Sequence, residues 1–411
     1  MMPITPQPGT TPGSRATSPA AAPARGLYVH WPFCVAKCPY CDFNSHVRGD
    51  VGAVETQRRW REAYMREMAT EAERIAGADV ATPLVSIFFG GGTPSLMEPE
   101  TAAAVIAQAA RLWGLAPDCE ITLEANPNSV ETARFAAFRD AGINRVSLGI
   151  QALDDASLRF LGRAHDRQQA LNALATAQRT FDRVSCDLIY ARPGQTVAAW
   201  RDELATAIGF GTSHLSAYQL TIEKGTPFYA AYHRGDFALP DEATAAALYE
   251  ATQTQLADAG LVQYEISNHA RRGEESRHNL LYWRGEDYIG IGPGAHGRVT
   301  QAGHCIATVR KHKPEDWLAA VARTGSGLHE TTTIECDDRL VEMLMMGLRL
   351  VEPVPRERFL RVAGGMPEAL LDAARLERLI AGGFLVLDDD GLRATDAGRQ
   401  RLNSVLAALL D

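Results

Sequence analysis

Three cysteines stand within eight residues near the N-terminus of the chain, in the sequence CVAKCPYCDF. Cys34, Cys38 and Cys41 form a C-x3-C-x2-C pattern, and no fourth cysteine lies nearby. Cysteine thiolates bind zinc or iron–sulfur clusters, and either kind of site usually takes four ligands. A zinc site would need a fourth ligand such as His30 or His46. In a [4Fe–4S] cluster, three thiolates would hold three irons and leave the fourth iron open to a small molecule.

The composition narrows the class of protein. The chain has 411 residues, of which 46% are hydrophobic, and its formal net charge is −9. This length predicts more than one domain, and the acidic balance without a long basic run argues against nucleic acid as a partner. Seven cysteines, an odd number, indicate a metal site in a reducing, cytoplasmic compartment rather than a disulfide framework. No stretch approaches the roughly 20 apolar residues of a membrane helix.

The first 25 residues differ from the rest of the chain. They contain six prolines, two arginines and no acidic residue. They lack the apolar core of a secretory signal, and the prolines argue against the amphipathic helix of a transit peptide, although that alternative stays open. We therefore predict a disordered leader over residues 1–25.

Short β-branched runs alternate with helical patterns between residue 26 and about residue 230. Strands are expected at 26–32, 84–92, 119–127, 145–151, 183–191 and 214–220. Helical periodicity is found at 53–76, 99–114, 131–141, 166–181 and 197–209. About six successive β–α units predict a parallel sheet with crossover helices. Because a closed barrel needs eight such units, we predict an α/β fold built on an open, partial barrel over residues 26–235.

Two further regions follow the predicted barrel. In the first, 236–329, a helix is expected at 241–261 and a strand at 262–270, before a glycine- and aromatic-rich stretch at 276–297 that has little periodicity. In the second, 330–411, the expected elements are helices at 337–350, 355–363 and 367–382, a hairpin around Asp388–Gly391 and a last helix. This order resembles a winged-helix unit. Because it is not strongly basic, a structural or docking role is expected rather than DNA binding.

Glycines and polar residues collect at the ends of the expected strands. The sequence GGGTPS, Gly90–Ser95, follows the second strand, where bare glycines would allow the backbone to approach a ligand or would simply make a tight turn. Glu124 and Gln151 end the third and fourth strands, and Asp187 lies in the fifth. Each could be a buried polar residue satisfied by its neighbours. Their position at the same end of parallel strands favours one shared site.

The cysteine triplet after the first strand of a β–α series resembles that of radical S-adenosylmethionine (SAM) enzymes. Seven further stretches resemble the oxygen-independent coproporphyrinogen oxidase superfamily, and within it the HemW-type heme chaperone branch: YVHWPFCVAKCPYCDFNSH, FFGGGTPSL, LEANP, RVSLGIQ, DLIYARPGQT, LSAYQLTIEKGTPF and HNLLYW. The resemblance spans about residues 26–300. It implies a [4Fe–4S] cluster whose open iron binds SAM, and an electron from the cluster that would split the sulfonium bond.

The resemblance also implies which residues bind these groups. The cluster ligands are Cys34, Cys38 and Cys41. The residues implied to contact SAM are Tyr28, Gly91, Gly92, Thr93, Glu124, Gln151, Arg163, Asp187, Thr221 and His296. The HNLLYW motif, with His278, Asn279, Tyr282 and Trp283, matches a heme-associated motif of the chaperone branch. There His278 would ligate heme iron, while Tyr282 and Trp283 would stack on the macrocycle. From the residues alone, the motif would be an aromatic anchor that packs a loop on the barrel.

Two departures distinguish the branches. The coproporphyrinogen oxidases carry another cysteine two residues after the third, where this chain has Phe43, and a structured N-terminal extension that is not expected here. Both favour the chaperone branch. Arg192, in ARPG, stands where the family often has a different residue, and the sequence does not explain it.

The implied function is that of a heme chaperone, which binds heme and transfers it to acceptor proteins. An electron donor such as flavodoxin or ferredoxin is an implied partner. The alternatives are an oxygen-independent coproporphyrinogen III oxidase and a related radical SAM methyltransferase. Whether SAM is cleaved, whether the chain forms a homodimer and whether it associates peripherally with a membrane stay open.

Overall fold

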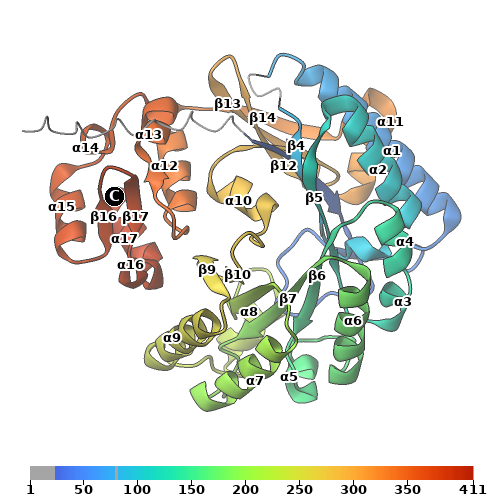
Figure 1. Cartoon of the computed structure of the whole chain (residues 1–411). Coiled ribbons are helices and arrows are strands. Elements are labelled where there is room, and N and C mark those ends of the chain that lie inside the picture. Colours follow the sequence, from blue (N-terminus) through green and yellow to red (C-terminus); the bar gives the residue numbers. More distant parts are fainter. Residues whose placement is uncertain (1–23, 79–81, 411) are drawn as a thin grey trace, which may run out of the picture.

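The computed structural model describes residues 24–78 and 82–410, and the centre of this part of the chain is a curved sheet of twelve strands (Figure 1). Seven neighbouring strands are parallel. In sheet order they are β11 (Asp287–Ile291), β1 (Arg25–Trp31), β4 (Leu84–Gly91), β5 (Leu115–Ala125), β6 (Arg145–Gln151), β7 (Arg183–Tyr190) and β8 (His214–Gln219). The sheet ends at β14 and β9 within the described residues, so the prediction of an open, partial α/β barrel is confirmed.

Antiparallel strands extend both edges of the parallel sheet. β12 (His296–Gln301), β13 (His304–Arg310) and β14 (Leu328–Ile334) follow β11, whereas β10 (Asn268–Ala270) and β9 (Val262–Glu265) follow β8. The single strand expected at 262–270 is wrong, because a turn divides it into the β9–β10 hairpin. The aromatic-rich stretch 276–297 contains the seven-residue helix α10 (Arg277–Trp283) and β11, which are too short to show a period in the sequence.

The start of the ordered sheet also departs from expectation. Of the leader predicted over residues 1–25, residues 1–23 lie outside the described part of the chain. Arg25 already belongs to β1, where it is buried and donates to the carbonyl of Thr82 at 3.0 Å. The strand therefore begins one residue earlier than the sequence indicated.

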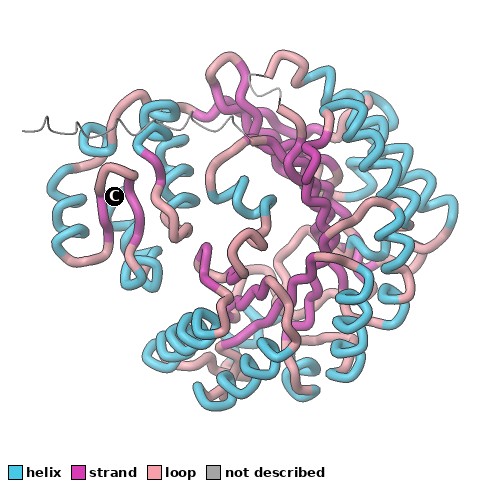
Figure 2. The backbone as a smooth tube through the Cα atoms, viewed as in Figure 1, coloured by secondary structure: helices cyan, strands magenta, loops and turns pink. Residues whose placement is uncertain are grey.

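Most helices of the barrel region pack on the convex side of the sheet, as Figure 2 shows. They are α1 (Val54–Arg74), α2 (Pro99–Trp113), α3 (Ser129–Thr132), α4 (Phe135–Asp140), α5 (Asp155–Phe160), α6 (Arg167–Thr180), α7 (Val197–Gly209), α8 (Pro227–Arg234), α9 (Glu242–Asp258) and α11 (Pro314–Thr324). The side chains of Asp154, Asp166, Thr196, Thr226 and Asp241 accept a backbone N–H and start five of these helices. Within the described residues, no helix combines the length and apolar character needed to cross a membrane.

Five of these helices differ from expectation, because α3 and α4 divide one predicted helix and α5, α8 and α11 were not predicted. The helix predicted at 131–141 is divided into α3 and α4, and at the break Arg134 donates to the carbonyl of Met97 at 2.7 Å. α5 is only six residues long, and the sequence gave no period for it.

The C-terminal domain has its own hydrophobic core. Its elements are α12 (Cys336–Gly347), β15 (Val354–Pro355), α13 (Arg356–Ala363), α14 (Pro367–Leu370), α15 (Ala373–Ala381), β16 (Leu385–Leu387), β17 (Gly391–Ala394), α16 (Asp396–Gln400) and α17 (Leu402–Leu410). The antiparallel β15–β17–β16 sheet with these helices agrees with the predicted winged-helix-like unit. β14 crosses the predicted boundary at residue 330, and the domain boundaries stay predictions.

Candidate functional site

The loop after β1 carries the three cysteines and is fastened to the end of β4. The short parallel strands β2 (Phe33–Cys34) and β3 (His46–Val47) pair across its base. The Gly92 N–H donates to the carbonyl of Trp31 at 2.7 Å. A Cβ atom at Gly92 would lie only 2.7 Å from the Phe33 carbonyl oxygen. Close packing of the two backbones is therefore enough to require a glycine at position 92, whether or not a ligand also approaches it.

Hydrogen-bonding groups reach all three cysteine sulfurs, and Ser45 Oγ lies 3.9 Å from Cys41 Sγ. The Thr93 hydroxyl donates to Cys34 Sγ at 3.4 Å, and the Arg163 guanidinium donates to Cys38 Sγ at 3.3 Å. Such donors stabilise negative charge on sulfur and shift the reduction potential of a bound metal centre. Burial raises the pKa of the Cys34 and Cys41 thiols, so metal binding at these thiols would release protons.

The donor set fits a cluster better than a single zinc ion. Within the described residues, no three His, Cys, Asp or Glu side chains converge as they would around one ion. In a [4Fe–4S] cluster each thiolate binds a different iron, so the sulfurs do not have to meet. His30 is engaged by Tyr28 Oη and the Asn44 carbonyl, each at 2.9 Å, and Nε2 of His46 lies 3.1 Å from Asn44 Oδ1. The two histidines considered as a fourth zinc ligand are thus already hydrogen-bonded.

A cavity of about 1110 Å³ lies over the C-terminal ends of the parallel strands, and all three cysteines line it. The candidate residues that line it are Cys34, Cys38, Cys41, Gly91, Gly92, Thr93, Glu124, Gln151, Arg163, Asp187 and Thr221. They come from the cysteine loop, from strands β4 to β7 and the residues that follow β4 and β8, and, for Arg163, from the segment between α5 and α6. The structure therefore brings together the cluster candidates and most of the SAM candidates, as expected for one edge of a parallel sheet.

The two strand acids of the cavity, Glu124 and Asp187, differ in how many hydrogen bonds they accept. Asp187 accepts hydrogen bonds from the hydroxyls of Ser147 at 2.8 Å and Ser185 at 3.0 Å. Glu124 accepts the Gly91 N–H at 3.3 Å. Burial, followed by the nearby charge of Asp187, raises the pKa of Glu124 to about 8. A cationic ligand in the cavity would relieve this repulsion, which makes Glu124 a candidate partner for an amino group.

The backbone at the ends of β6 and β7 is unusual. Gln151 has a φ of +71° and Ala191 a φ of +57°, in the left-handed region that non-glycine residues seldom occupy. Gln151 lines the cavity in this conformation. Next to it, Arg163 donates to the Gly149 carbonyl at 2.9 Å and to Asn126 Oδ1. Arg163 thus links the end of β6 to the cysteine loop.

The structure explains Arg192, which the sequence did not. Its side chain is buried and forms an ion pair with Glu203 on α7. The other carboxylate oxygen of Glu203 accepts the Leu153 N–H at 2.8 Å. One carboxylate therefore connects the loop after β6 with the loop after β7, next to the strained Gln151 and Ala191.

Two SAM candidates do not line the cavity. Tyr28 lies on β1, where its ring is 6.4 Å from that of Phe88 and 6.3 Å from that of His278, and its hydroxyl bonds to His30. His296 is exposed at the start of β12. The structure therefore gives neither residue a direct place in the cavity.

The HNLLYW motif forms α10, which lies on the concave side of the sheet (Figure 1). His278 is fully buried, with Nδ1 at 2.8 Å from Ser86 Oγ and Nε2 at 2.8 Å from Tyr282 Oη. Burial and the charge of Arg145 lower the pKa of His278 to about 3. Both ring nitrogens are occupied, so His278 does not present a ligand atom in this arrangement.

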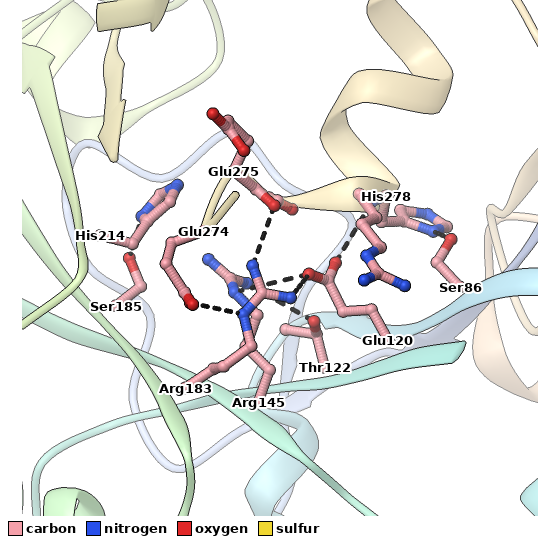
Figure 3. A network of polar contacts seen from close by, with 12 residues as sticks. Ser86, Glu120, Thr122, Arg145, Arg183, Ser185, His214, Glu274, Glu275 and His278 are labelled. Atoms are coloured by element: carbon pink, nitrogen blue, oxygen red, sulfur yellow. Dashed lines mark hydrogen bonds and ion pairs between the residues drawn. The ribbon is translucent and has the colours of Figure 1, made fainter. Parts of the chain in front are cut away.

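Around His278, buried charges form the network drawn in Figure 3. Glu120 accepts the His278 N–H at 3.2 Å and forms an ion pair with Arg183 at 2.6 Å, while Arg145 lies 4.0 Å away. Arg183 also pairs with Glu274 at 2.9 Å. These groups satisfy one another's charges and hydrogen bonds. They hold α10, and the residue Glu274 before it, against the strands of the barrel.

Other cavity residues were missed by the sequence analysis. Asn126 and Tyr40 stand within the motifs LEANP and CPYC, so their position beside Glu124 and Cys41 was a usable signal. Tyr218, Tyr249, Arg349, Arg399 and Arg401 also line the cavity. The arginines belong to the C-terminal domain, and no local pattern predicts that it reaches the strand ends.

The fold and the site together define a class. A partial barrel with a three-cysteine loop after its first strand is the arrangement expected of a radical SAM protein. Residues 28–207 match the Radical SAM superfamily, and residues 334–401 match the HemN C-terminal domain.

Comparison with known proteins narrows this class. The chain is 40% identical to mouse (Mus musculus) radical S-adenosyl methionine domain-containing protein 1, mitochondrial, over 96% of this chain and 89% of the relative. It is 35% identical to the heme chaperone HemW of Escherichia coli, over 94% of this chain and 98% of the relative. The chain belongs to the radical SAM family that these relatives form. Its fold matches Escherichia coli coproporphyrinogen III oxidase (HemN), a radical SAM enzyme, with a TM-score of 0.77 at 20% identity, over 94% of this chain and 90% of that one.

Proposed function

We propose that this protein is a heme chaperone, which binds heme beside a [4Fe–4S] cluster and SAM and passes heme to an acceptor protein without changing it. The observation that carries the proposal is the similarity, over almost the whole length of both chains, to relatives named heme chaperone HemW. The HNLLYW motif and Phe43, at the place of a fourth cysteine, agree with this branch.

The described site supports cluster and SAM binding in specific ways. Cys34, Cys38 and Cys41 would hold the cluster, and the Thr93 and Arg163 donors would stabilise its sulfur charge. Glu124 would accept the amino group of SAM. When bound, the cluster and SAM supply one-electron chemistry at the open iron. The chain contributes the placement of these groups and a cavity closed by a second domain.

Heme binding through His278 requires a rearrangement. Because Ser86 and Tyr282 occupy both ring nitrogens, His278 can reach heme iron only after α10 shifts. Trp283 is nearer to the cavity, since the guanidinium of Arg349, a cavity residue, lies 4.7 Å from the centre of its ring. We retain His278 as the proposed axial ligand, with Tyr282 and Trp283 against the macrocycle.

Two parallel assays on anaerobically reconstituted protein test this function. The wild type should bind hemin with a shifted Soret band, and should leave coproporphyrinogen III unchanged in the presence of SAM and a reductant. His278→Ala should change the Soret band or weaken hemin binding while it retains its iron and sulfide. Decarboxylated porphyrinogen would instead establish the oxidase alternative. An unchanged hemin spectrum and affinity in His278→Ala would remove His278 as a ligand.

The remaining expectations stay predictions. They are an electron donor such as flavodoxin or ferredoxin, a heme-accepting protein, a homodimer, peripheral membrane association and a cytoplasmic location.

A further inference from the structure

The two walls of the cavity differ in the charged side chains that they carry. The barrel wall carries the two strand acids, Glu124 and Asp187, together with Arg163, whose guanidinium is hydrogen-bonded to Cys38, Asn126 and Gly149. The opposite wall belongs to the C-terminal domain and contains Arg349, just after α12, and residues 399–404 from α16 and α17. A ligand that fills the cavity would therefore meet carboxylates at one end and guanidinium groups at the other.

Two of these arginines, Arg349 and Arg399, each keep one buried nitrogen without a partner in the described part of the chain. Nε of Arg349 and Nε of Arg399 are buried and have no hydrogen-bond partner within the described residues. The Arg399 side chain is only 5% exposed, and its other two nitrogens donate to the Ala394 carbonyl at 2.7 Å and to the exposed Asp396. Nη2 of Arg349 lies 3.9 Å from Glu265 Oε2, too far for a hydrogen bond. A buried N–H without an acceptor destabilises the empty protein, so two at the wall of one cavity point to a ligand that supplies acceptors.

Arg401 adds a third charge to the same wall. It is exposed, and no ion pair to its side chain occurs among the described residues. Glu265 lies 3.9 Å from Arg349 and Asp396 pairs with Arg399, so the three arginines exceed these two acids by one positive charge. Asp42, Glu223 and Glu242 also line the cavity, but all three are exposed, where water screens their charge.

We propose that Arg349, Arg399 and Arg401 form a carboxylate-binding subsite that takes the propionate groups of the porphyrin. Guanidinium groups match carboxylates in geometry and charge. Arg349 also lies against the indole of Trp283, so a propionate bound here would place the apolar macrocycle next to the HNLLYW motif. The volume of about 1110 Å³ exceeds the usual range for one small ligand and leaves room beside SAM. The inference rests on the proposed heme-binding function and adds to it how the ligand is oriented.

The test compares hemin with hemin dimethyl ester, in which both propionates are esterified. Anaerobically reconstituted wild type should bind hemin about tenfold or more tightly than the ester, because charge-assisted hydrogen bonds contribute about 1.5–3 kcal/mol. Arg349→Gln/Arg401→Gln should lose this preference by binding hemin more weakly, with ester affinity, iron content and SAM affinity unchanged. Arg378→Gln, at an exposed arginine of α15 outside the cavity, is the matched control and should behave as wild type.

Each other outcome has a defined meaning. Wild type that binds hemin and its ester equally, or a double variant that keeps the preference, would overturn the subsite and leave the chaperone proposal standing. A loss of SAM affinity with hemin binding retained would assign the arginines to the carboxylate of SAM and overturn the inference. No hemin binding by wild type would refute the proposed function itself. If the double variant fails to fold, Arg401→Gln at an exposed position provides the same comparison.

Discussion

The open barrel contains two sets of polar residues, and they differ in whether their charges are paired with one another. The inner layer, Glu120, Arg145, Arg183 and His278, lies deeper in the barrel, and its members bond to one another (Figure 3). The mouth layer consists of Glu124, Gln151, Arg163 and Asp187 and lines the cavity. The inner layer has opposite charges in contact. The mouth layer places two acids near each other, one of them with a strongly raised pKa.

This difference separates structural polar residues from ligand-binding ones. A buried charge that is fully paired within the fold stabilises one arrangement of it, and removal of a partner leaves an uncompensated charge. A buried acid with few partners destabilises the empty protein and becomes favourable when a ligand supplies the opposite charge. Variants of the inner layer should therefore change stability, and variants of the mouth layer should change ligand binding.

The largest effect is expected at the cysteine loop beside the mouth layer. Cys38→Ala should abolish the cluster, because two thiolates cannot hold a site that holds about four irons and four sulfides in wild type. Iron and acid-labile sulfide are measured after anaerobic reconstitution. Cys336→Ala, at an exposed cysteine outside the loop, should retain the wild-type content. Stoichiometric zinc without sulfide in wild-type protein purified without air would contradict the cluster.

In the inner layer, Glu120→Ala should destabilise the fold by about 3–5 kcal/mol, since Arg183 and Arg145 lose a buried counter-charge. The free energy of unfolding is measured by denaturant titration of the cluster-free protein. Glu274→Ala removes a more exposed partner of Arg183 and should lower the free energy of unfolding by less than Glu120→Ala does. Equal free energies of unfolding for the two variants would show that the buried Glu120 pairing does not stabilise the fold more than the exposed Glu274 pairing does.

In the mouth layer, Glu124→Gln should weaken SAM binding by about tenfold or more, because a charged hydrogen bond is replaced by a neutral one. Calorimetry on the reconstituted protein measures the affinity. Iron content should stay the same, and the unfolding midpoint of the cluster-free protein should be equal or higher. Unchanged SAM affinity would show that Glu124 is not a SAM contact.

The same substitution should remove a pH dependence of stability. The pKa of Glu124 is about 8 in the fold against an ordinary value of 4.5, so between these values the native state holds a proton that the unfolded chain has released. The unfolding free energy of wild type should therefore fall, relative to that of Glu124→Gln, as pH rises from 4.5 to about 8, and the difference should level off above that. Parallel stability curves for the two proteins would argue against the raised pKa.

The smallest effect is expected at α10. Tyr282→Phe removes the hydroxyl that bonds to His278 Nε2 and should cost about 1 kcal/mol of stability. If His278 is a heme ligand after α10 shifts, the loss of this bond should leave hemin affinity equal or higher. A strong loss of hemin affinity without a change in stability would instead place the Tyr282 hydroxyl in contact with heme.

The sequence by itself determined the repeat of β–α units and the position of the cysteine loop. Both follow from local patterns: apolar runs with strand or helix periods, and three cysteines at a spacing that one loop can present. Because parallel strands share an edge, it also indicated that Glu124, Gln151 and Asp187 would lie together. The sequence singled out Glu124 by its position at the end of a strand, but it did not show that Glu120, on the same face of β5, would be paired within the fold.

Tertiary structure decided which polar residues are satisfied and which face a ligand. Glu120 meets Arg183 from another strand, whereas Glu124 meets a cavity, and this difference depends on contacts between residues distant in the chain. It also placed His278 between Ser86 and Tyr282, and Arg192 on Glu203. Finally, only packing of the C-terminal domain brought Arg349, Arg399 and Arg401 over the strand ends. No local pattern encodes that approach, because it arises from how two distinct hydrophobic cores pack together.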